Sequence, residues 1–291
     1  MIRRKAYAKL DLAIHIDPKK KADGYFPVHY IDCQIDLCDR LGFENQAKKI
    51  EVHCSDPDVP VGKDNFVNRA AQLVKKTIGR KSLGAKITLE KNIPIKAGFG
   101  GGSSDAAATI LGLLNLWKVK LDESQKKRIA RSLGKDFYYS LYGGLSEVIG
   151  DGKNYKVTVL SSRLPRLWLL IVVPSEQKPS TAWVYEHLKT KDIGHNFDKL
   201  EKLKTAILKS DKIGILKNLT NDFEDFMSFN FPIIGTIKTD LARVGAQATI
   251  MAGSGLSVVG FFDSLKNVQA AKNKLKNMQG LKKVLVTKIK N

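Results

Sequence analysis

Residues 94–107 have the types and the spacing that could do chemistry. Four glycines, Gly98 and the run 100–102, leave Phe99 as the only side chain across five consecutive positions. Without a Cβ the backbone can approach a ligand closely and adopt positive φ angles. Where such a loop opens a helix, its N–H groups and the helix dipole attract an anion. The stretch therefore predicts a phosphate-binding loop.

Two serines, Ser103 and Ser104, follow the glycines. Either hydroxyl can cap the next helix, bond a phosphate oxygen or reach a magnesium ion. The stretch is not a Walker A loop, because no Gly-Lys-Ser/Thr ends it, and it fits the dinucleotide-binding fingerprint only if the last glycine is replaced. A plain strand-to-helix turn needs one or two glycines, so the phosphate-binding interpretation is favoured over it.

Alternating and helical periodicities predict the elements that must position this loop. In the first part of the chain they predict strands over 7–16, 28–37, 40–52, 85–90 and 145–160, and helices from Asp64 onward, over 105–117 and over 122–133. In the second part they predict strands over 167–173, 248–251, 257–262 and 283–289, and helices over 180–189, 197–210, 212–219, 231–244 and 264–278. Strands and helices mix without regular βαβ alternation, which favours an α+β fold in two domains, residues 1–160 and 161–291.

Composition narrows the class of protein. Hydrophobic content of 43% and charged content of 27% are typical of a soluble globular chain. No apolar run approaches the roughly 20 residues that span a bilayer, and no signal-peptide segment follows the basic N-terminus, so we expect a cytoplasmic protein without a membrane partner. Three cysteines, Cys33, Cys38 and Cys54, lack the spacing of a disulfide framework or zinc site, and the first two are expected to be buried thiols.

The formal net charge is +20, from 49 basic and 29 acidic residues. Three interpretations compete: attraction of anionic nucleotides, binding of nucleic acid, or a lysine-rich solvated surface. The excess is mostly lysine and is scattered along the chain, whereas nucleic-acid readers concentrate arginine and aromatic residues on one element. We therefore favour the solvated surface and expect no nucleic-acid partner.

The glycine loop resembles the phosphate-binding motif of the GHMP kinases, which include galactokinase, homoserine kinase, mevalonate kinase and phosphomevalonate kinase. Within that superfamily the chain resembles the 4-diphosphocytidyl-2-C-methyl-D-erythritol kinases in several separated segments. These segments are 8–12 (AKLDL, like AKLNL), 22–25 (ADGY, like ADGYH), 64–71 (like DNL…RAA), 133–136 (LGKD, like LGAD) and 251–255 (MAGSG, like MSGSG). The matches run in order over most of the chain.

This resemblance implies a two-domain GHMP kinase fold, with an N-terminal domain like ribosomal S5 domain 2 and a C-terminal ferredoxin-like α/β sandwich. It implies ATP-dependent phosphorylation of an alcohol hydroxyl, with Mg2+, on 4-diphosphocytidyl-2-C-methyl-D-erythritol. That reaction belongs to the methylerythritol phosphate pathway of isoprenoid precursor synthesis. The expected partner is a small-molecule substrate, and the expected state is a monomer or homodimer.

The resemblance also implies roles for individual residues. Asp136 would accept the proton of the substrate hydroxyl, Lys9 would be the cation beside it, and Asn65 would lie near the adenine. The residues implied to hold ATP are Pro94, Ile95, Lys96, Ala97, Gly98, Phe99, Gly100, Gly101, Gly102, Ser103 and Ser104. The residues implied to bind the acceptor are Asp11, Tyr25, Phe26, Thr181, Tyr185, Gly253 and Ser254, with the two tyrosines on either side of the cytosine. The resemblance implies no metal ligand beyond Ser104 as a candidate.

The chain departs from the family pattern in places predicted to lie on the acceptor side. Phe26 stands where the family has a histidine that contacts the cytosine, and a phenyl ring makes no such hydrogen bonds. Asp11 replaces an asparagine, residues 137–139 (FYY) replace a valine–proline pair, and His29 is a candidate for the lost base contact. Two alternatives therefore stay open: a GHMP kinase for another acceptor, such as mevalonate or a phosphomevalonate-like alcohol, and a non-catalytic nucleic-acid-binding relative.

Overall fold

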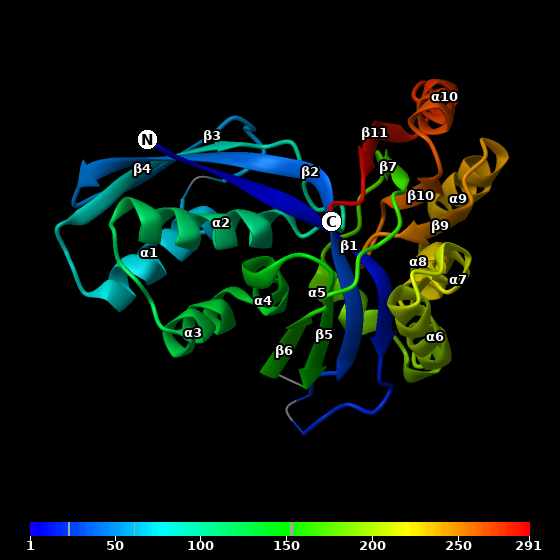
Figure 1. Cartoon of the computed structure of the whole chain (residues 1–291), viewed down its shortest axis with the longest axis horizontal. Coiled ribbons are helices and arrows are strands. Elements are labelled where there is room, and N and C mark those ends of the chain that lie inside the picture. The colour runs from blue at the N-terminus through cyan, green and yellow to red at the C-terminus, as the bar shows by residue number, and fades with distance from the viewer. Residues whose placement is uncertain (23, 61, 152–153) are drawn as a thin grey trace. The chain divides into compact units, whose positions relative to one another are not determined.

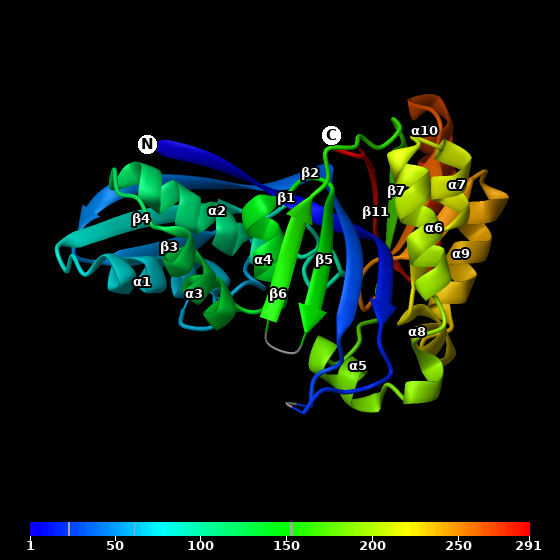
Figure 2. The same cartoon turned by 60° about the horizontal axis from the view of Figure 1, so that its bottom comes forward.

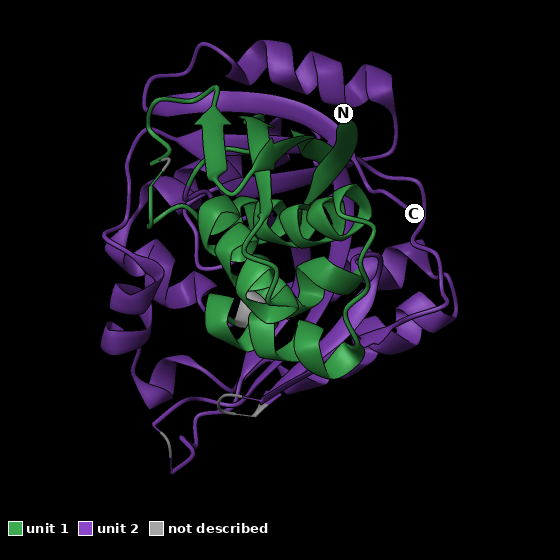
Figure 3. Ribbon diagram, turned by 90° about the vertical axis from the view of Figure 1, so that its left-hand side faces the viewer, with its two compact units in different colours: residues 1–9, 37–95, 100–142 green, residues 10–36, 96–99, 143–291 purple. Residues whose placement is uncertain are grey.

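The computed structural model describes residues 1–22, 24–60, 62–151 and 154–291. They form two compact units, shown in green and purple in Figure 3. Unit 1 holds residues 1–9, 37–95 and 100–142, and unit 2 holds residues 10–36, 96–99 and 143–291. The units interleave along the chain and so do not test the contiguous domains 1–160 and 161–291, which stay a prediction. The mixture of helices with two separate sheets confirms the predicted α+β class.

The strands of the larger sheet follow the order β3-β4-β2-β1-β8, and the β5–β6 hairpin joins it through β2. Its strands are β1 (Ile2–Ile16), β2 (Val28–Ala47), β3 (Ile50–Cys54), β4 (Leu83–Glu90), β5 (Ser146–Asp151), β6 (Asn154–Val159) and β8 (Thr220–Asn221). The 37–47 part of β2 belongs to unit 1, where β2 pairs antiparallel with β4 and β4 pairs parallel with β3. The 28–32 part belongs to unit 2 and pairs with β5.

Unit 1 adds four helices that lie together beside its strands (Figure 1). They are α1 (Phe66–Ile78), α2 (Gly101–Leu116), α3 (Glu123–Leu133) and α4 (Lys135–Tyr142). Helix α2 packs on α1 and α4, and α3 packs on α1 and α4. Helix α1 begins where predicted, because Asn65 caps it by accepting from Val67 N at 2.7 Å. The buried face of α2 therefore forms the centre of this unit.

Three predictions in unit 1 are wrong. The strand expected over 40–52 is not continuous, because β2 ends at Ala47 and β3 begins at Ile50. The break expected at residues 38–39 does not exist, and β2 runs through it, because Asp39 is buried and its carboxylate is fully bonded. Helix α2 begins at Gly101 and not at Asp105, so Ser103 and Ser104 lie inside its first turn. The residue before it, Gly100, has φ 65° and makes no side-chain cap.

Unit 2 contains a second sheet in the order β11-β7-β10-β9, with every pair antiparallel. Figure 1 labels all four strands, and Figure 2 labels β7 and β11 in a turned view. Its strands are β7 (Trp168–Pro174), β9 (Ala248–Met251), β10 (Val258–Phe262) and β11 (Leu281–Lys288). The helices of unit 2 are α5 (Thr181–His187), the 3-10 turn η1 (Thr190–Asp192), α6 (Phe197–Leu208), α7 (Lys212–Lys217), α8 (Glu224–Asn230), α9 (Ile233–Arg243) and α10 (Leu265–Leu275). Among the described residues, no helix is long and apolar enough to cross a membrane.

The sequence did not predict β8 or α8. The two residues of β8 are too few to show a period. The remaining strands and helices of unit 2 lie within a few residues of their predicted ranges. None of the three cysteines forms a disulfide: Cys33 is buried as expected, whereas Cys38 is only half-buried.

Gly112 of α2 packs closely against Phe43 in the core of unit 1. A Cβ at this buried position would overlap the ring of Phe43, which has no exposed surface. We expect Gly112→Ala to lower the free energy of unfolding by about 1–3 kcal/mol, because overpacking forces neighbours to move. The matched control is Gly235→Ala in α9, where a Cβ meets nothing within 4 Å. It should raise stability by about 0.5–1 kcal/mol through helix propensity. Urea unfolding measures both, and equal effects would contradict this packing.

Candidate active site

The glycine loop is divided between the two units at the bond between Phe99 and Gly100. In unit 2, Gly98 has φ 94° and packs against the turn that follows β9, so closely that a Cβ would overlap the carbonyl oxygen of Ala252. On that turn a Cβ on Gly253 would lie 2.9 Å from the carbonyl oxygen of Gly98. The structure thus brings together the loop and the Gly253–Gly255 turn, two segments singled out from the sequence.

In unit 1 the second half of the loop lies beside Lys9. A Cβ on Gly100 would stand 3.0 Å from Cγ of Lys9, and one on Gly102 would stand 3.0 Å from the ring of Phe66. The Lys9 side chain is buried, with 7% of its surface exposed. The predicted cation therefore runs alongside the predicted phosphate loop.

The start of α2 fits a phosphate group. Its first bond within the helix runs from Ser104 N to the carbonyl oxygen of Gly100, at 3.0 Å. The N–H groups of residues 101–103 precede that bond and so have no acceptor within the helix. Together with the dipole of this 16-residue helix, these N–H groups favour an anion at the start of α2.

Ser104 itself serves the fold. Its hydroxyl donates to the carbonyl oxygen of Tyr7 at 2.7 Å, which ties the first turn of α2 to β1, and the residue is buried. Among the described residues there is no group of three or more His, Cys, Asp or Glu side chains that could hold a metal ion.

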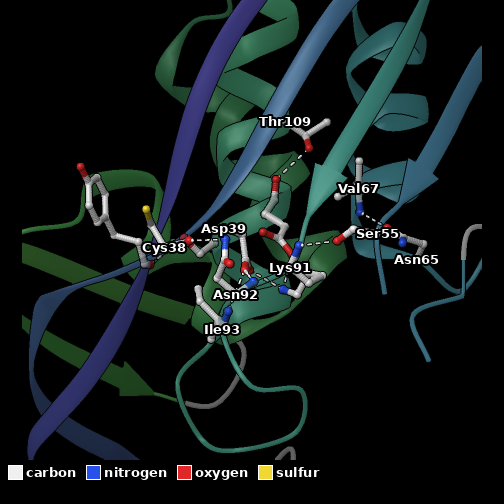
Figure 4. Close-up of polar contacts among 12 residues, drawn as sticks. Cys38, Asp39, Ser55, Asn65, Val67, Lys91, Asn92, Ile93 and Thr109 are labelled. Carbon is white, nitrogen blue, oxygen red and sulfur yellow. Dashed lines mark hydrogen bonds and ion pairs between the residues drawn. The ribbon is translucent and has the colours of Figure 1, made fainter. Parts of the chain in front are cut away.

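Asp39, Lys91 and Asp105 form a buried ionic cluster next to the start of α2, and the sequence analysis missed it. Lys91 Nζ donates to Asp39 Oδ2 and, at 2.8 Å, to Asp105 Oδ2 (Figure 4). The other oxygen of Asp39 accepts the backbone N–H groups of Asn92 and Ile93, at 2.6 and 2.8 Å. The three charged side chains are at most 6% exposed. The signal available beforehand was an aspartate inside an apolar strand, since a charge buried there needs a partner.

One cation shared by two carboxylates leaves an excess of negative charge. Burial raises the pKa of Asp105 to about 8. The negative charge of Asp39 raises this pKa further, whereas the positive charge of Lys91 lowers it. The Oδ1 atom of Asp105 is buried without a hydrogen-bond partner among the described residues. Lys91 Nζ would lie 3.3 Å from a Cβ on Gly101, so the cluster packs against the first residue of α2.

Asn65 and the segment containing Asp136 also belong to unit 1. The Asn65 amide donates to the carbonyl oxygen of Pro60 at 2.6 Å while its oxygen caps α1, so both ends of the side chain are engaged locally. Asp136 is the second residue of α4, and its side chain lies outside the described part of the chain. The aromatic residues 137–139, which follow it and depart from the family pattern, are buried.

Several residues predicted to bind the acceptor meet within unit 2. Thr181 Oγ1 lies 3.2 Å from Ser254 Oγ, which joins the start of α5 to the Gly253–Gly255 turn. One turn further along α5, the hydroxyl of Tyr185 lies 3.2 Å from that of Tyr30. The Tyr185 ring also meets Phe223 edge-on, with ring centres 5.2 Å apart. Helix α5 therefore carries Tyr185 and Thr181, and Thr181 contacts Ser254 on the turn after β9.

Asn221, which the sequence analysis did not single out, fixes this turn. Its buried amide donates to the carbonyl oxygens of Met251 at 2.8 Å and Gly253 at 2.7 Å. Its oxygen accepts from Phe223 N at 3.0 Å. A fully bonded buried amide of this kind sets the position of the backbone it spans.

The remaining predicted acceptor residues lie near the N-terminal part of unit 2. Tyr25 is 52% exposed on a turn in which its carbonyl oxygen accepts from Lys21 N, and Asp23 of this turn lies outside the described residues. Phe26 is buried with Lys20 Nζ 4.7 Å from its ring centre, and Asp11 is buried on β1. His29, the candidate substitute for the missing histidine, is bonded instead to Glu147 Oε1 at 2.7 Å.

Comparison with known proteins agrees with this geometry. The model of the GHMP kinases N terminal domain matches residues 65–148, which include α1 and the whole glycine loop. Among solved structures, a 4-(cytidine 5'-diphospho)-2C-methyl-D-erythritol kinase matches with a TM-score of 0.81 and 26% identity over the whole of both chains. The Leishmania major mevalonate kinase complex has a TM-score of 0.74 and 17% identity, covers 100% of this chain and 96% of its own, and shows the fold alone. The fold and the loop together define a kinase of the GHMP class.

Full-length relatives narrow the family. A 4-diphosphocytidyl-2-C-methyl-D-erythritol kinase of Thermoanaerobacter pseudethanolicus is 34% identical over 95% of this chain and 93% of its own length. One from Acetivibrio thermocellus is 36% identical over 96% of each. The chain therefore belongs to the 4-diphosphocytidyl-2-C-methyl-D-erythritol kinase family. It is a phosphotransferase that uses ATP, as its family does.

The close approach at Gly98 predicts how the loop responds to one added methyl group. We expect Gly98→Ala to weaken ATP binding at least about tenfold, because the Cβ must displace the loop or the Ala252 carbonyl. Gly245→Ala is the matched control, with φ 95° and nothing within 4 Å of its Cβ. Both variants carry a backbone strain of about 1–2 kcal/mol. A difference in ATP affinity between them, measured by calorimetric titration, therefore reports the steric overlap at Gly98 alone. Equal nucleotide affinities in the two variants would show that the overlap does not matter.

The raised pKa of Asp105 predicts a pH dependence of stability. The folded chain holds a proton on this carboxyl that the unfolded chain releases near pH 4, so its contribution is lost as the pH rises toward about 8. Asp105→Asn mimics the protonated carboxyl and should flatten the fall in unfolding free energy between about pH 4 and 8. Exposed Glu44→Gln, in the same unit, should keep the wild-type slope. Urea unfolding across this range measures the slopes, and an unchanged slope in Asp105→Asn would refute the assignment.

Proposed function

We propose that the chain transfers the γ-phosphoryl group of ATP to an alcohol hydroxyl of 4-diphosphocytidyl-2-C-methyl-D-erythritol, in the synthesis of isoprenoid precursors. The observation that carries this proposal is the glycine cradle with Lys9 running alongside it. It is supported by relatives that carry the name of this kinase over nearly the whole chain. The enzyme would act in the cytoplasm as a monomer or homodimer, without nucleic-acid or membrane partners.

The chemistry required is positioning and charge stabilisation, because phosphoryl transfer needs little else from a protein. The N–H groups at residues 98–103 would hold the ATP phosphates, and Mg2+ would come bound to those phosphate oxygens. Lys9 would balance charge on the transferring group, and Asp136 would accept the hydroxyl proton. Asn65 would stand beside the adenine through its position at the start of α1, since its amide is already bonded.

On the acceptor side, Tyr185 and Tyr25 would stack on the cytosine, and Thr181 with Ser254 would contact the polar part of the ester. Phe26 offers no hydrogen bond to a base, and its ring is buried beside Lys20. This observation favours a second candidate, a GHMP kinase with another acceptor alcohol such as mevalonate or phosphomevalonate.

A panel of acceptors separates the two candidates. Purified protein is incubated with ATP, Mg2+ and either the cytidine diphosphate ester, mevalonate, phosphomevalonate or homoserine, and ADP release is followed. The proposal predicts the highest kcat/KM with the ester. Turnover of another alcohol with none on the ester would move the chain to the second candidate.

Asp136→Asn tests the role of the carboxylate with little change of shape. We expect kcat to fall by about 10²–10⁴, because a positioned base contributes that much, while the KM values for ATP and acceptor change little. Steady-state kinetics, with Glu44→Gln as an exposed carboxylate control in the same unit, measure the effect. A kcat within threefold of wild type would remove Asp136 from the mechanism.

A further inference from the structure

Lys178 is a partly buried cation at the Gly253–Gly255 turn, and it has no role in the account so far. It precedes α5, and its Nζ donates to the carbonyl oxygen of Gly255. The side chain thus reaches the same turn that Thr181 contacts through Ser254. Two separate side chains from one short segment, one cationic and one a hydroxyl, therefore converge on three consecutive residues.

Lys178 differs in its partners from three other partly buried lysines, Lys91, Lys204 and Lys238. Lys91, Lys204 and Lys238 each form an ion pair with at least one carboxylate. Lys178 forms none with a described residue, and the carboxylate nearest to it in sequence, Glu176, is exposed. An ammonium group withdrawn from water is normally paired, because a carbonyl oxygen compensates only part of the lost hydration.

Burial lowers the pKa of Lys178 to about 8, and no described charged group offsets that effect. A protein keeps such a group at a net cost to folding, unless something that binds the folded state supplies the missing negative charge. The acceptor of the proposed reaction carries a diphosphate, which has that charge. The ammonium group of lysine commonly binds phosphate oxygens as a point charge.

We propose that Lys178 binds a phosphate oxygen of the acceptor substrate and so selects acceptors that carry an anionic group. This assignment rests on the proposed function and adds a residue to its acceptor side. The acceptor is favoured over ATP because the contacts of Lys178 lead toward acceptor residues. Gly255 is its direct partner, and Thr181 and Tyr185 lie on the helix that follows it. The nucleotide loop meets the opposite end of the turn, through Gly98 at Ala252 and Gly253.

Kinetics of Lys178→Met and Lys178→Arg test this assignment. Methionine keeps the apolar stem and removes the charge, and loss of an unpaired cation should not destabilise the fold. We expect the KM for the cytidine diphosphate ester to rise about 10- to 100-fold in Lys178→Met and less in Lys178→Arg. The KM for ATP should change less than about threefold. Lys266→Met, which removes an exposed charge from α10, controls for net charge and should match the wild type.

The pH profile adds a readout that a purely structural role would not move. Only the protonated amine attracts an anion, so the wild-type KM for the ester should rise several-fold per pH unit above about 8. The Lys178→Met profile should lack that rise. An ester KM within twofold of wild type in Lys178→Met would overturn the proposal. A rise confined to the KM for ATP would also overturn it, because the contact would then belong to the donor phosphates.

A binding measurement keeps this test separate from the proposed reaction. Calorimetric titration with cytidine diphosphate, without ATP, should give an affinity that falls about tenfold or more in Lys178→Met. Absence of turnover on the ester would reject the proposed function while leaving this comparison readable. Equal cytidine diphosphate affinities in wild type and Lys178→Met, or no binding to either, would reject Lys178 as a phosphate-binding residue.

Discussion

The absence of a Cβ at Gly98 is the constraint on which the rest of the site depends. The backbone of the glycine loop packs directly on the carbonyl of Ala252, at a φ angle that other residues adopt only under strain. The Asn221 amide fixes the turn that contains Ala252 by donating to the carbonyl oxygens of Met251 and Gly253. Thr181 contacts the same turn through Ser254. One close contact therefore connects the part of the glycine loop in unit 2 to the helix that carries the predicted acceptor residues.

Buried charge is handled in two different ways in this molecule. In unit 1, Lys91 is surrounded by two carboxylates, one of which is pushed toward its protonated form, and the cluster fixes the beginning of α2. This is charge used for structure, with its partners supplied by the chain itself. In unit 2, Lys178 has a carbonyl oxygen and no described carboxylate. The contrast is what marks Lys178 as a residue whose partner comes from outside the protein.

The sequence predicted the elements that have a strong local signal. The glycine loop, the start of α1 at Asn65 and most strands and helices lie where periodicity and capping placed them. It failed where tertiary contacts decide: Asp39 continues β2 because Lys91, 52 residues away, neutralises it. Asn221 and Lys178 were missed because a lone amide or lysine carries no pattern, and its partners become visible only in three dimensions.

The central claim is that the loop at residues 98–103 holds the phosphates of ATP in a kinase for a cytidine diphosphate ester. A crystal structure with a non-hydrolysable ATP analogue and the ester tests it most directly. The account predicts phosphate oxygens on the N–H groups at the start of α2, and a cytosine ring against Tyr185. Phosphates bound away from these N–H groups, or an ester that contacts neither Tyr185 nor Thr181, would contradict it.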